Sequence, residues 1–238
     1  MFEINQKYPL LFTKSNGKYQ ELHSPNDLKT IANIQLATAE DITLLINELR
    51  TFQKNFQKIS KLEIACALKH IATRILEEKE SFAHLIATEG GKPLKDALIE
   101  VERASLTFTL CAEEATRIHG EMIPMERSSA ALGKIAFTMK EPIGPVLAIS
   151  AFNHPLNLLA HQVGCALASG CVVVLKPSPG TPLNAYQLKR LFLETTLPPE
   201  VLTIVPCDIP EIEQMVANKV FGYVSFIGSA KVGWSLRS

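Results

Sequence analysis

The sequence lacks an excess of charge of either sign and has no long uninterrupted apolar run. Lys plus Arg and Asp plus Glu each number 24 among 238 residues, so the formal net charge is zero. A nucleic-acid-binding protein needs a basic excess to neutralise phosphates, so this composition argues against one. The most apolar stretch, residues 155–175, is interrupted by polar residues and two glycines, so we expect no membrane span.

Cysteines are few and irregularly placed. The five cysteines form no C-x-x-C pair and stand at positions 66, 111, 165, 171 and 207. This spacing gives no support to a zinc site or a redox-active dithiol, and we expect no metal. A scattered, odd number of thiols indicates a reducing compartment. The first residues also lack the basic stretch and long apolar region of a signal peptide, so we expect a cytoplasmic protein.

The sequence also lacks the common glycine-rich phosphate motifs. No G-x-G-x-x-G follows an apolar run, and no G-x-x-x-x-G-K-[ST] occurs. Gly90–Gly91–Lys92 has neither the upstream glycine nor the strand of such a loop, so we interpret it as a helix stop. A dinucleotide site in this chain would have to hold its phosphates in another way.

The region from about residue 39 to residue 118 predicts four amphipathic helices, because apolar residues recur at helical spacing. The segment 37–41 offers a cap and early acidic residues for the first helix, and the second begins near Ser60. The third ends near Gly90–Gly91, and the fourth follows Pro93. The usual role of such apolar stripes is packing.

The second half of the chain alternates short apolar runs with helix-length segments. The runs are Val146–Ile149, Val172–Leu175, Val201–Val205 and Tyr223–Ile227. Near-continuous apolar strands separated by helices predict the α/β class, with an open, mostly parallel Rossmann-like sheet covered by helices on both faces. We expect the N-terminal helical region to precede this sheet.

Two local patterns give further expectations. Gly133–Lys140 alternates in polarity and is rich in β-formers, so it predicts one half-exposed strand. Thr181 precedes a helix-length segment that begins at Pro182, so it is the expected N-cap of that helix.

Ligands of parallel sheets bind outside the carboxyl ends of the strands, so those ends hold the candidate site. Gly228–Ser229 joins a strand to a helix, whose N-terminus suits a phosphate unless Ser229 is simply a cap. Lys176 could donate to a ribose or a phosphate, or could simply reach solvent. Asn153 could donate to an oxyanion in a carbonyl reaction, or could bond locally in an Asx turn.

Several segments also follow one another in a characteristic order. They are Ile149–Leu156, Leu175–Ser178 followed by Thr181–Leu183, and Val224–Ser229 followed by Val232–Gly233, with Glu89–Leu94, Glu100–Val101 and Pro145–Ile149 upstream. This order resembles the N-terminal, cofactor-binding half of the NAD(P)-dependent aldehyde dehydrogenase superfamily. The resemblance covers nearly the whole chain in register.

The resemblance implies a role for each residue at the strand ends. It implies that Asn153 helps to form the oxyanion hole for a thiohemiacetal intermediate. It implies that NAD or NADP is held by a set of segments: Ile149, Ser150, Ala151 and Phe152 at the nicotinamide half, Lys176, Ser178 and Pro179 at the adenosine ribose, Gly228 and Ser229 at the pyrophosphate, and Val232 beside the adenine.

The resemblance also implies an organisation and a reaction. Residues 1–124 and 141–238 would form an incomplete cofactor-binding domain, and 125–140 a strand of an oligomerisation arm in a homodimer or tetramer. In the family, a cysteine attacks the aldehyde, hydride passes to the nicotinamide, and water activated by a glutamate releases the acid. Both groups would lie beyond residue 238 in a catalytic domain, so this chain by itself is expected to bind cofactor without turnover.

Three departures from the family pattern concern the site. Ala151 replaces a proline, Phe152 stands where tryptophan is common, and His154 replaces an aromatic residue, which would reshape the aldehyde entrance. Pro179 stands where NAD-preferring members often carry a glutamate, so the choice between NAD and NADP stays open. The segment 206–211 lacks the glycines expected on the adenine side.

Two alternatives stay open beside oxidation of an aldehyde to a carboxylic acid. One is a related acyl-phosphate reductase that works toward the aldehyde. The other is a non-catalytic nucleotide-binding or assembly module. Gly233–Trp234 and the 176–183 pattern resemble members that act on small hydroxy- or semialdehydes.

Overall fold

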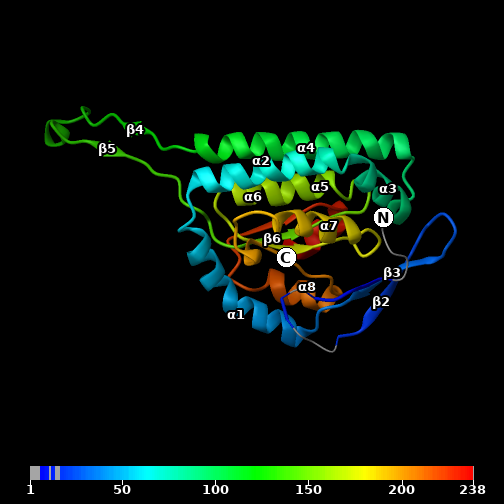
Figure 1. The fold of residues 1–238 in the computed structure, drawn as a ribbon. Helices are drawn as coiled ribbons and strands as arrows, with labels where there is room; N and C mark the ends of the chain where they lie inside the picture. Colours follow the sequence, from blue (N-terminus) through cyan, green and yellow to red (C-terminus); the bar gives the residue numbers. More distant parts are fainter. Residues whose placement is uncertain (1–5, 11, 14–16, 238) are drawn as a thin grey trace.

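A four-stranded parallel sheet forms the centre of the computed structural model, which describes residues 6–10, 12–13 and 17–237 (Figure 1). The strand order is β8-β7-β6-β9, with the bounds Val146–Ile149 (β6), Val173–Lys176 (β7), Leu202–Ile204 (β8) and Tyr223–Phe226 (β9). Strands β6, β7 and β8 are buried along their whole length, whereas β9 is a partly exposed edge. The predicted α/β class and parallel sheet are therefore confirmed.

Helices cover both faces of this sheet because its strands are apolar on both sides. Val146, Ala148, Val173 and Leu175 belong to a core shared with one helical layer. That layer contains α2 (Lys61–Glu77), α3 (Lys79–Gly90), α4 (Leu94–Arg117), α7 (Leu183–Phe192) and a helical stretch over 157–168. The stretch consists of α5 (Asn157–Leu159), a π-helical turn η2 (Ala160–Gly164) and α6 (Cys165–Ala168).

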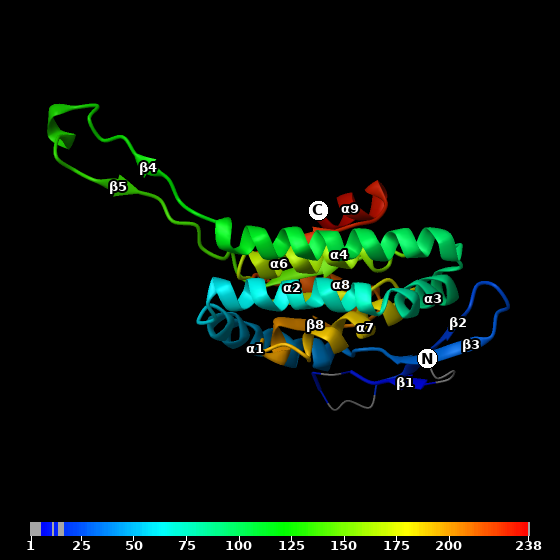
Figure 2. The same ribbon diagram turned by 45° about the horizontal axis from the view of Figure 1, so that its top comes forward.

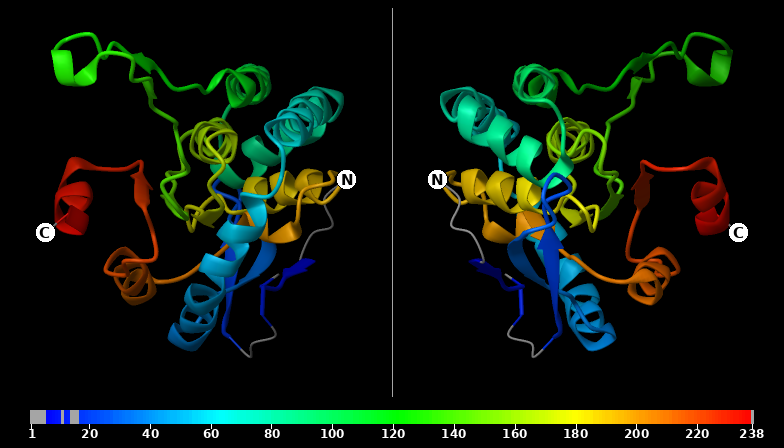
Figure 3. Two further views of the ribbon diagram at one scale, coloured as in Figure 1. Left: turned by 90° about the vertical axis from the view of Figure 1, so that its left-hand side faces the viewer. Right: turned by 90° about the vertical axis from the view of Figure 1, so that its right-hand side faces the viewer.

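The intervening strand residues Leu147, Ile149 and Val174 face a second core with α1 (Ala39–Phe56) and α8 (Ile209–Val216). A short 3₁₀ turn, η3 (Pro199–Val201), leads into β8. The last helix, α9 (Ala230–Arg237), follows β9 and buries none of its residues. Seen from the side in Figure 3, β9 and α9 lie at one margin of the molecule. In the described part of the chain, no helix has an apolar stretch long enough to cross a membrane.

The predicted helix boundaries in the first half are confirmed by their caps. The side chains of Thr38 and Asp41 bond reciprocally at the start of α1, and Ser60 and Glu63 do the same at α2. Helix α3 ends at Gly91, whose φ of 66° is the left-handed conformation that favours glycine. These boundaries were predictable because each cap is made by residues only a few positions apart.

Strands also precede the predicted helical region, in a part of the chain for which the sequence pattern gave no prediction. Three strands, β1 (Gln6–Tyr8), β2 (Tyr19–His23) and β3 (Thr30–Gln35), form a separate sheet with the order β1-β3-β2. Strand β2 is mostly exposed, and only one of its five residues is buried. Because it carries few apolar residues, its sequence gave little strand signal.

A long hairpin projects from the body between α4 and β6, as Figures 1 and 2 show. Its paired strands are only β4 (Met122–Ile123) and β5 (Ala136–Phe137), with a 3₁₀ turn η1 (Ser129–Ala131) between them. The strand expected over Gly133–Lys140 is therefore limited to two residues. Without a third strand or a packed face, a two-stranded ribbon forms few ladder bonds. The division of the chain at 125–140 stays a prediction.

Candidate functional site

The carboxyl ends of β6, β7 and β9 meet at one edge of the sheet. Ile149 of β6 lies in register with Lys176 of β7 on one side and with Phe226 of β9 on the other. The Ser150 amide donates to the carbonyl of Lys176 (3.1 Å), and the Ile227 amide donates to that of Ile149 (3.0 Å). The parallel topology thus brings together three segments that are far apart in the sequence, as predicted.

Lys176 has an unusual environment for a lysine. Its side chain is only 8% exposed, and burial lowers the pKa of its ammonium group, with Cys207 and Asp208 opposing that effect. Within the described ranges, no acceptor lies within hydrogen-bond distance of the ammonium nitrogen. A largely desolvated and unpaired cation is costly unless a ligand completes its coordination. Lys176 therefore suits a hydroxyl-rich or anionic ligand.

Ser178 and Pro179 follow Lys176 along the same edge. With Lys176 they line a narrow cavity of about 20 Å³ against the N-terminal sheet, which has room for about one water molecule. Cys207 also lines this cavity, and burial raises the pKa of its thiol to about 12. Cys207 is thus unsuited to act as a nucleophile at neutral pH. Strands β2 and β3, which the sequence did not predict, form the opposite wall of the cavity. The sequence of the second half of the chain therefore could not reveal this wall.

Ser150, Ala151, Phe152 and Asn153 follow β6 in sequence. The Ser150 hydroxyl is buried and has no hydrogen-bond partner in the described part of the molecule. Phe152 is 67% exposed, and Asn153 is exposed as well. The Asn153 amide makes no hydrogen bond to the described residues, so the alternative of a locally bonded Asx turn has no support. The exposed Asn153 amide is therefore available to a ligand, whereas the Ser150 hydroxyl is an unsatisfied buried group beside it in sequence.

A buried carboxylate fixes the backbone that follows Asn153. Glu100 of α4 is 1% exposed and accepts hydrogen bonds from the amides of Leu156 (2.9 Å) and Asn157 (3.1 Å). These are free N–H groups at the start of α5, so Glu100 caps that helix from a distant part of the chain. Glu100 also forms an ion pair with Lys92.

His154, which replaces an aromatic residue of the family pattern, contacts both Lys92 and Glu100. Its Nδ1 lies 2.9 Å from the Lys92 ammonium and 3.4 Å from the Glu100 carboxylate. An ammonium group can only donate, so Nδ1 is the acceptor in the contact with Lys92. The cluster Lys92–Glu100–His154 ties the segment that carries Asn153 to α4.

Glu89 caps the helix that follows the neighbouring strand, β7, in the way that Glu100 caps α5. It is buried at the end of α3 and accepts hydrogen bonds from the backbone amides of Leu183 (2.7 Å) and Asn184 (3.1 Å) and from the Asn184 side chain. Burial raises the pKa of the Glu89 carboxyl to about 7, although these three donors act in the opposite direction. The N-cap predicted at Thr181 is therefore wrong, because α7 is capped by Glu89 and its Ncap position is Pro182.

Gln162 holds the edge strand in place. Its buried side-chain amide donates to the carbonyl oxygens of Ile149 (3.2 Å) and Ser225 (2.8 Å) and to the Ser225 hydroxyl (3.1 Å). The Gln162 side chain thus links β6 to β9 next to the carboxyl ends of these strands.

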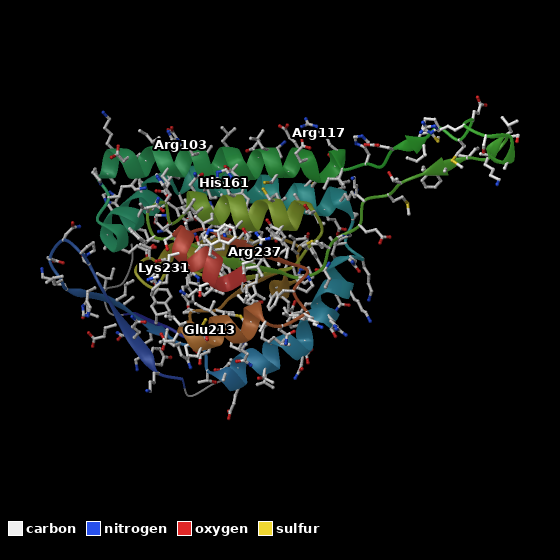
Figure 4. The ribbon with its side chains drawn as sticks, turned by 180° about the vertical axis from the view of Figure 1, so that it is seen from behind. Arg103, Arg117, His161, Glu213, Lys231 and Arg237 are labelled. Carbon is white, nitrogen blue, oxygen red and sulfur yellow. The ribbon has the colours of Figure 1, made fainter. Side chains whose placement is uncertain are left out.

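Gly228 and Ser229 connect β9 to α9. The Ser229 hydroxyl accepts from the Val232 amide (3.4 Å) and its carbonyl from that of Gly233 (3.0 Å), so Ser229 is the helix cap. A Cβ atom at Gly228 would lie 2.4 Å from the Phe226 ring, which explains the glycine. Val232 is exposed one turn further on. Figure 4 shows α9 from behind, with Lys231 and Arg237 labelled.

The model of the aldehyde dehydrogenase family matches residues 12–238. The chain belongs to this family. In the ranges that the structure describes, no three histidine, cysteine, aspartate or glutamate side chains are grouped as a metal site. The groups that could bind a ligand at this edge of the aldehyde dehydrogenase fold are the backbone at the strand ends, one lysine and several neutral polar side chains.

Proteins with similar sequences or structures align with almost the whole chain. A 3-sulfolactaldehyde dehydrogenase from Priestia aryabhattai is 40% identical over 209 residues, which are 87% of this chain and 43% of that protein. The crystal structure of aldehyde dehydrogenase 21 from Physcomitrella patens, in complex with the reaction product succinate, superposes with a TM-score of 0.94 at 31% identity, covering 99% of this chain and 50% of that one.

A third similar protein was solved with a dinucleotide. It is a glyceraldehyde-3-phosphate dehydrogenase from Methanocaldococcus jannaschii in complex with NADP, with a TM-score of 0.87 at 30% identity, covering 94% of this chain and 49% of that one. This aldehyde dehydrogenase chain therefore spans about half the length of the relatives it matches.

Four residues that support the site were not singled out from the sequence as site residues: Glu89, Lys92, Glu100 and Gln162. Glu89 and Glu100 lie within segments that resemble the family, but their partners are 94 and 56 residues away. A buried glutamate in an otherwise apolar helical stripe is the one local signal that could have drawn attention to them.

Proposed function

We propose that this chain is the cofactor-binding part of an NAD(P)-dependent aldehyde dehydrogenase that oxidises an aldehyde to a carboxylic acid. The observation that carries the proposal is the meeting, at one edge of an aldehyde dehydrogenase fold, of the unpaired Lys176 ammonium, the unpaired Ser150 hydroxyl and the β9–α9 turn. These are the groups that a dinucleotide needs, since it is anionic at its phosphates and rich in hydroxyls at its riboses.

The cofactor would be NAD or NADP and would accept the hydride when bound. Ile149, Ser150, Ala151 and Phe152 would flank its nicotinamide half, Lys176, Ser178 and Pro179 its adenosine ribose, Gly228 and Ser229 its pyrophosphate, and Val232 its adenine. The N-terminus of α9 supports the pyrophosphate assignment, because the amides of Ala230 and Lys231 have no acceptor among the described residues, although Ser229 occupies the amide of Val232. Because Pro179 has no side-chain acceptor for a ribose hydroxyl, NADP is a candidate cofactor as well as NAD.

Asn153 would donate its side-chain amide to the oxyanion that develops when a nucleophile adds to the aldehyde carbonyl. A neutral amide held in place before the reaction stabilises such charge without reorganising. Its exposed, unbonded amide and the Lys92–Glu100–His154 cluster behind it support this role. We place the nucleophilic cysteine and the general-base glutamate outside these 238 residues.

The substrate class follows from the relatives. The Priestia protein acts, by its name, on an aldehyde that carries a sulfonate, and the Physcomitrella structure holds a dicarboxylate product. We therefore propose a small aldehyde with an acidic or hydroxyl group at its other end. The full protein would be a homodimer or tetramer, and a location in the cytoplasm stays a prediction.

An assay of the purified full-length protein tests this function. We expect aldehyde-dependent reduction of NAD or NADP with 3-sulfolactaldehyde or succinate semialdehyde, release of the matching acid, and a lower kcat/KM with the unsubstituted aldehyde propanal. Formation of aldehyde from an acyl phosphate, without net oxidation of the free aldehyde, would identify the reductase instead. Cofactor binding without either reaction would indicate the assembly module.

A further inference from the structure

Two cysteines that are far apart in the sequence place their sulfur atoms side by side. Cys111 lies in α4 and Cys165 begins α6, and their Sγ atoms are 3.8 Å apart although 54 residues separate them. Cys111 is buried, whereas Cys165 is exposed to solvent. The spacing along the chain suggested no such dithiol, because it is formed only by the packing of the two helices.

Gly164 lies directly against the Cys111 sulfur. A Cβ atom at Gly164 would lie 3.0 Å from the Cys111 sulfur and 3.4 Å from the Phe108 ring. A side chain at this position would therefore require the Cys111 sulfur to shift by a few tenths of an ångström. The sulfur pair is thus a consequence of close helix packing around the π-helical turn that ends at Gly164.

The two thiols differ in reactivity because one donates to the other. The hydrogen bond from Cys111 lowers the pKa of the Cys165 thiol to about 7, and it raises the pKa of Cys111, with burial adding to the rise. The thiolate form is therefore favoured on Cys165, which is the more exposed residue of the pair. The thiolate is the form of cysteine that attacks peroxides.

We propose that Cys165 is a peroxide-reactive thiol and that Cys111 is its resolving partner, so that a peroxide converts the pair into a disulfide between α4 and α6. The Cys165 thiolate attacks one oxygen of the peroxide, the O–O bond breaks, and a sulfenic acid forms with release of water or an alcohol. Oxidation of Cys165 removes the hydrogen bond that is the largest cause of the raised Cys111 pKa. The Cys111 thiol then passes its proton to the sulfenic oxygen as its sulfur attacks the sulfenic sulfur, and water leaves. Two thiols are oxidised, one peroxide is reduced, and no further reactant is needed.

The geometry requires only a small movement. A disulfide has a sulfur–sulfur distance of about 2.04 Å, so the two atoms must approach by roughly 1.8 Å. The bond would join α4, which carries Glu100, to the helical stretch that starts after Asn153. The proposal does not depend on the proposed function.

Hydrogen peroxide is the probe, applied to the purified protein at neutral pH and followed by intact mass and non-reducing peptide mapping. We expect a species lighter by two hydrogens, reversed by dithiothreitol, with the peptides of Cys111 and Cys165 linked. The matched control is Cys66→Ser, which removes another exposed thiol and leaves the linkage unchanged. Addition of oxygen to Cys165 without a linkage, or a linkage between other cysteines, would overturn the proposal.

Alkylation of Cys165 by iodoacetamide provides the second test. In the natural sequence we expect the alkylation rate to reach half its maximum near pH 7. In Cys111→Ala the midpoint should move toward the ordinary thiol value of about 8.5, and peroxide should then add oxygen to Cys165 without forming a disulfide. An identical midpoint in both proteins would contradict the assigned hydrogen bond. Should Cys111→Ala fail to fold, the peptide map of the unchanged sequence decides.

Discussion

Two buried glutamates, Glu89 and Glu100, perform the same task at the carboxyl edge of the sheet. Each comes from the helical first half and accepts the free backbone amides at the start of a helix that follows a central strand. Neither helix has a side-chain cap of its own. The loop that carries Asn153 and the loop that follows Lys176 are therefore held in place by carboxylates from outside the sheet.

Glu89 predicts a dependence of stability on pH. Its pKa rises from an ordinary value of 4.5 to about 7 on folding, so the folded chain binds a proton more tightly than the unfolded chain. Stability from this group is complete below pH 4.5 and is lost as the pH rises to about 7, by about 3 kcal/mol. Urea unfolding of the natural protein and of Glu89→Gln between pH 5 and pH 8 measures this, since the variant should lack this part of the slope. The same slope in both proteins would contradict the assignment.

Asn153 predicts a change in the chemical step. In the full-length enzyme we expect Asn153→Ala to lower kcat about 100-fold, the typical effect of removing one oxyanion donor, and to leave the Kd of the cofactor within about twofold. Asn26→Ala, at an exposed loop position outside the site, serves as the matched control. A kcat equal to that of the control would return Asn153 to a role in the turn alone.

At the scale of elements, the attachment of the 157–168 stretch to α4 depends on the pair of Lys92 and Glu100. We expect Glu100→Ala to lower the free energy of unfolding by about 3 kcal/mol, because it removes the acceptor of the Leu156 and Asn157 amides and the carboxylate that pairs with Lys92. The matched control is Glu102→Ala on the same helix, which breaks the exposed pair with Lys79 and should cost less than about 1 kcal/mol. Equal losses in chemical denaturation would show that Glu100 is not a structural anchor.

The elements that could be predicted from the sequence were those specified locally. Helices α1 and α2 begin at reciprocal caps, and β6 and β7 are continuous apolar runs with both faces buried. Strands β2 and β3 were missed because their half-exposed residues do not form an apolar run, and they are held by pairing with each other. The start of α7 was assigned to Thr181 because no local rule reveals a cap that comes from 94 residues away.

In the candidate site, too, the features set by the strand pattern were predictable and the features set by the packing of distant segments were not. The predicted parallel sheet placed the segments that begin at Ser150, Lys176 and Gly228 at one edge, since parallel strands end on the same side, and the pairing of β6 with β7 and β9 agrees with this. The cavity wall formed by β2 and the support from Glu89, Glu100 and Gln162 were not predictable, because they depend on how separate layers pack. The sulfur pair of Cys111 and Cys165 arises in the same way.

At the scale of the whole molecule, the hairpin between α4 and β6 is the most exposed apolar feature. Ile135, Phe137 and Met139 are 80%, 65% and 71% exposed. We expect the double variant Ile135→Asp, Phe137→Asp to lower the mass measured by light scattering to that of a monomer, while circular dichroism stays unchanged. Leu44→Asp, at an exposed position on α1, should leave the mass as it is. An unchanged mass in the double variant would exclude the hairpin as the oligomerisation arm.

The most direct test of the cofactor site is a titration of NAD and NADP into the purified protein by calorimetry, with Lys176→Met and the exposed-lysine control Lys69→Met. We predict that at least one dinucleotide binds with a Kd below about 1 mM, that Lys176→Met weakens it about tenfold, and that Lys69→Met does not change it. Absence of binding to 1 mM, or equal Kd values for all three proteins, would contradict the account.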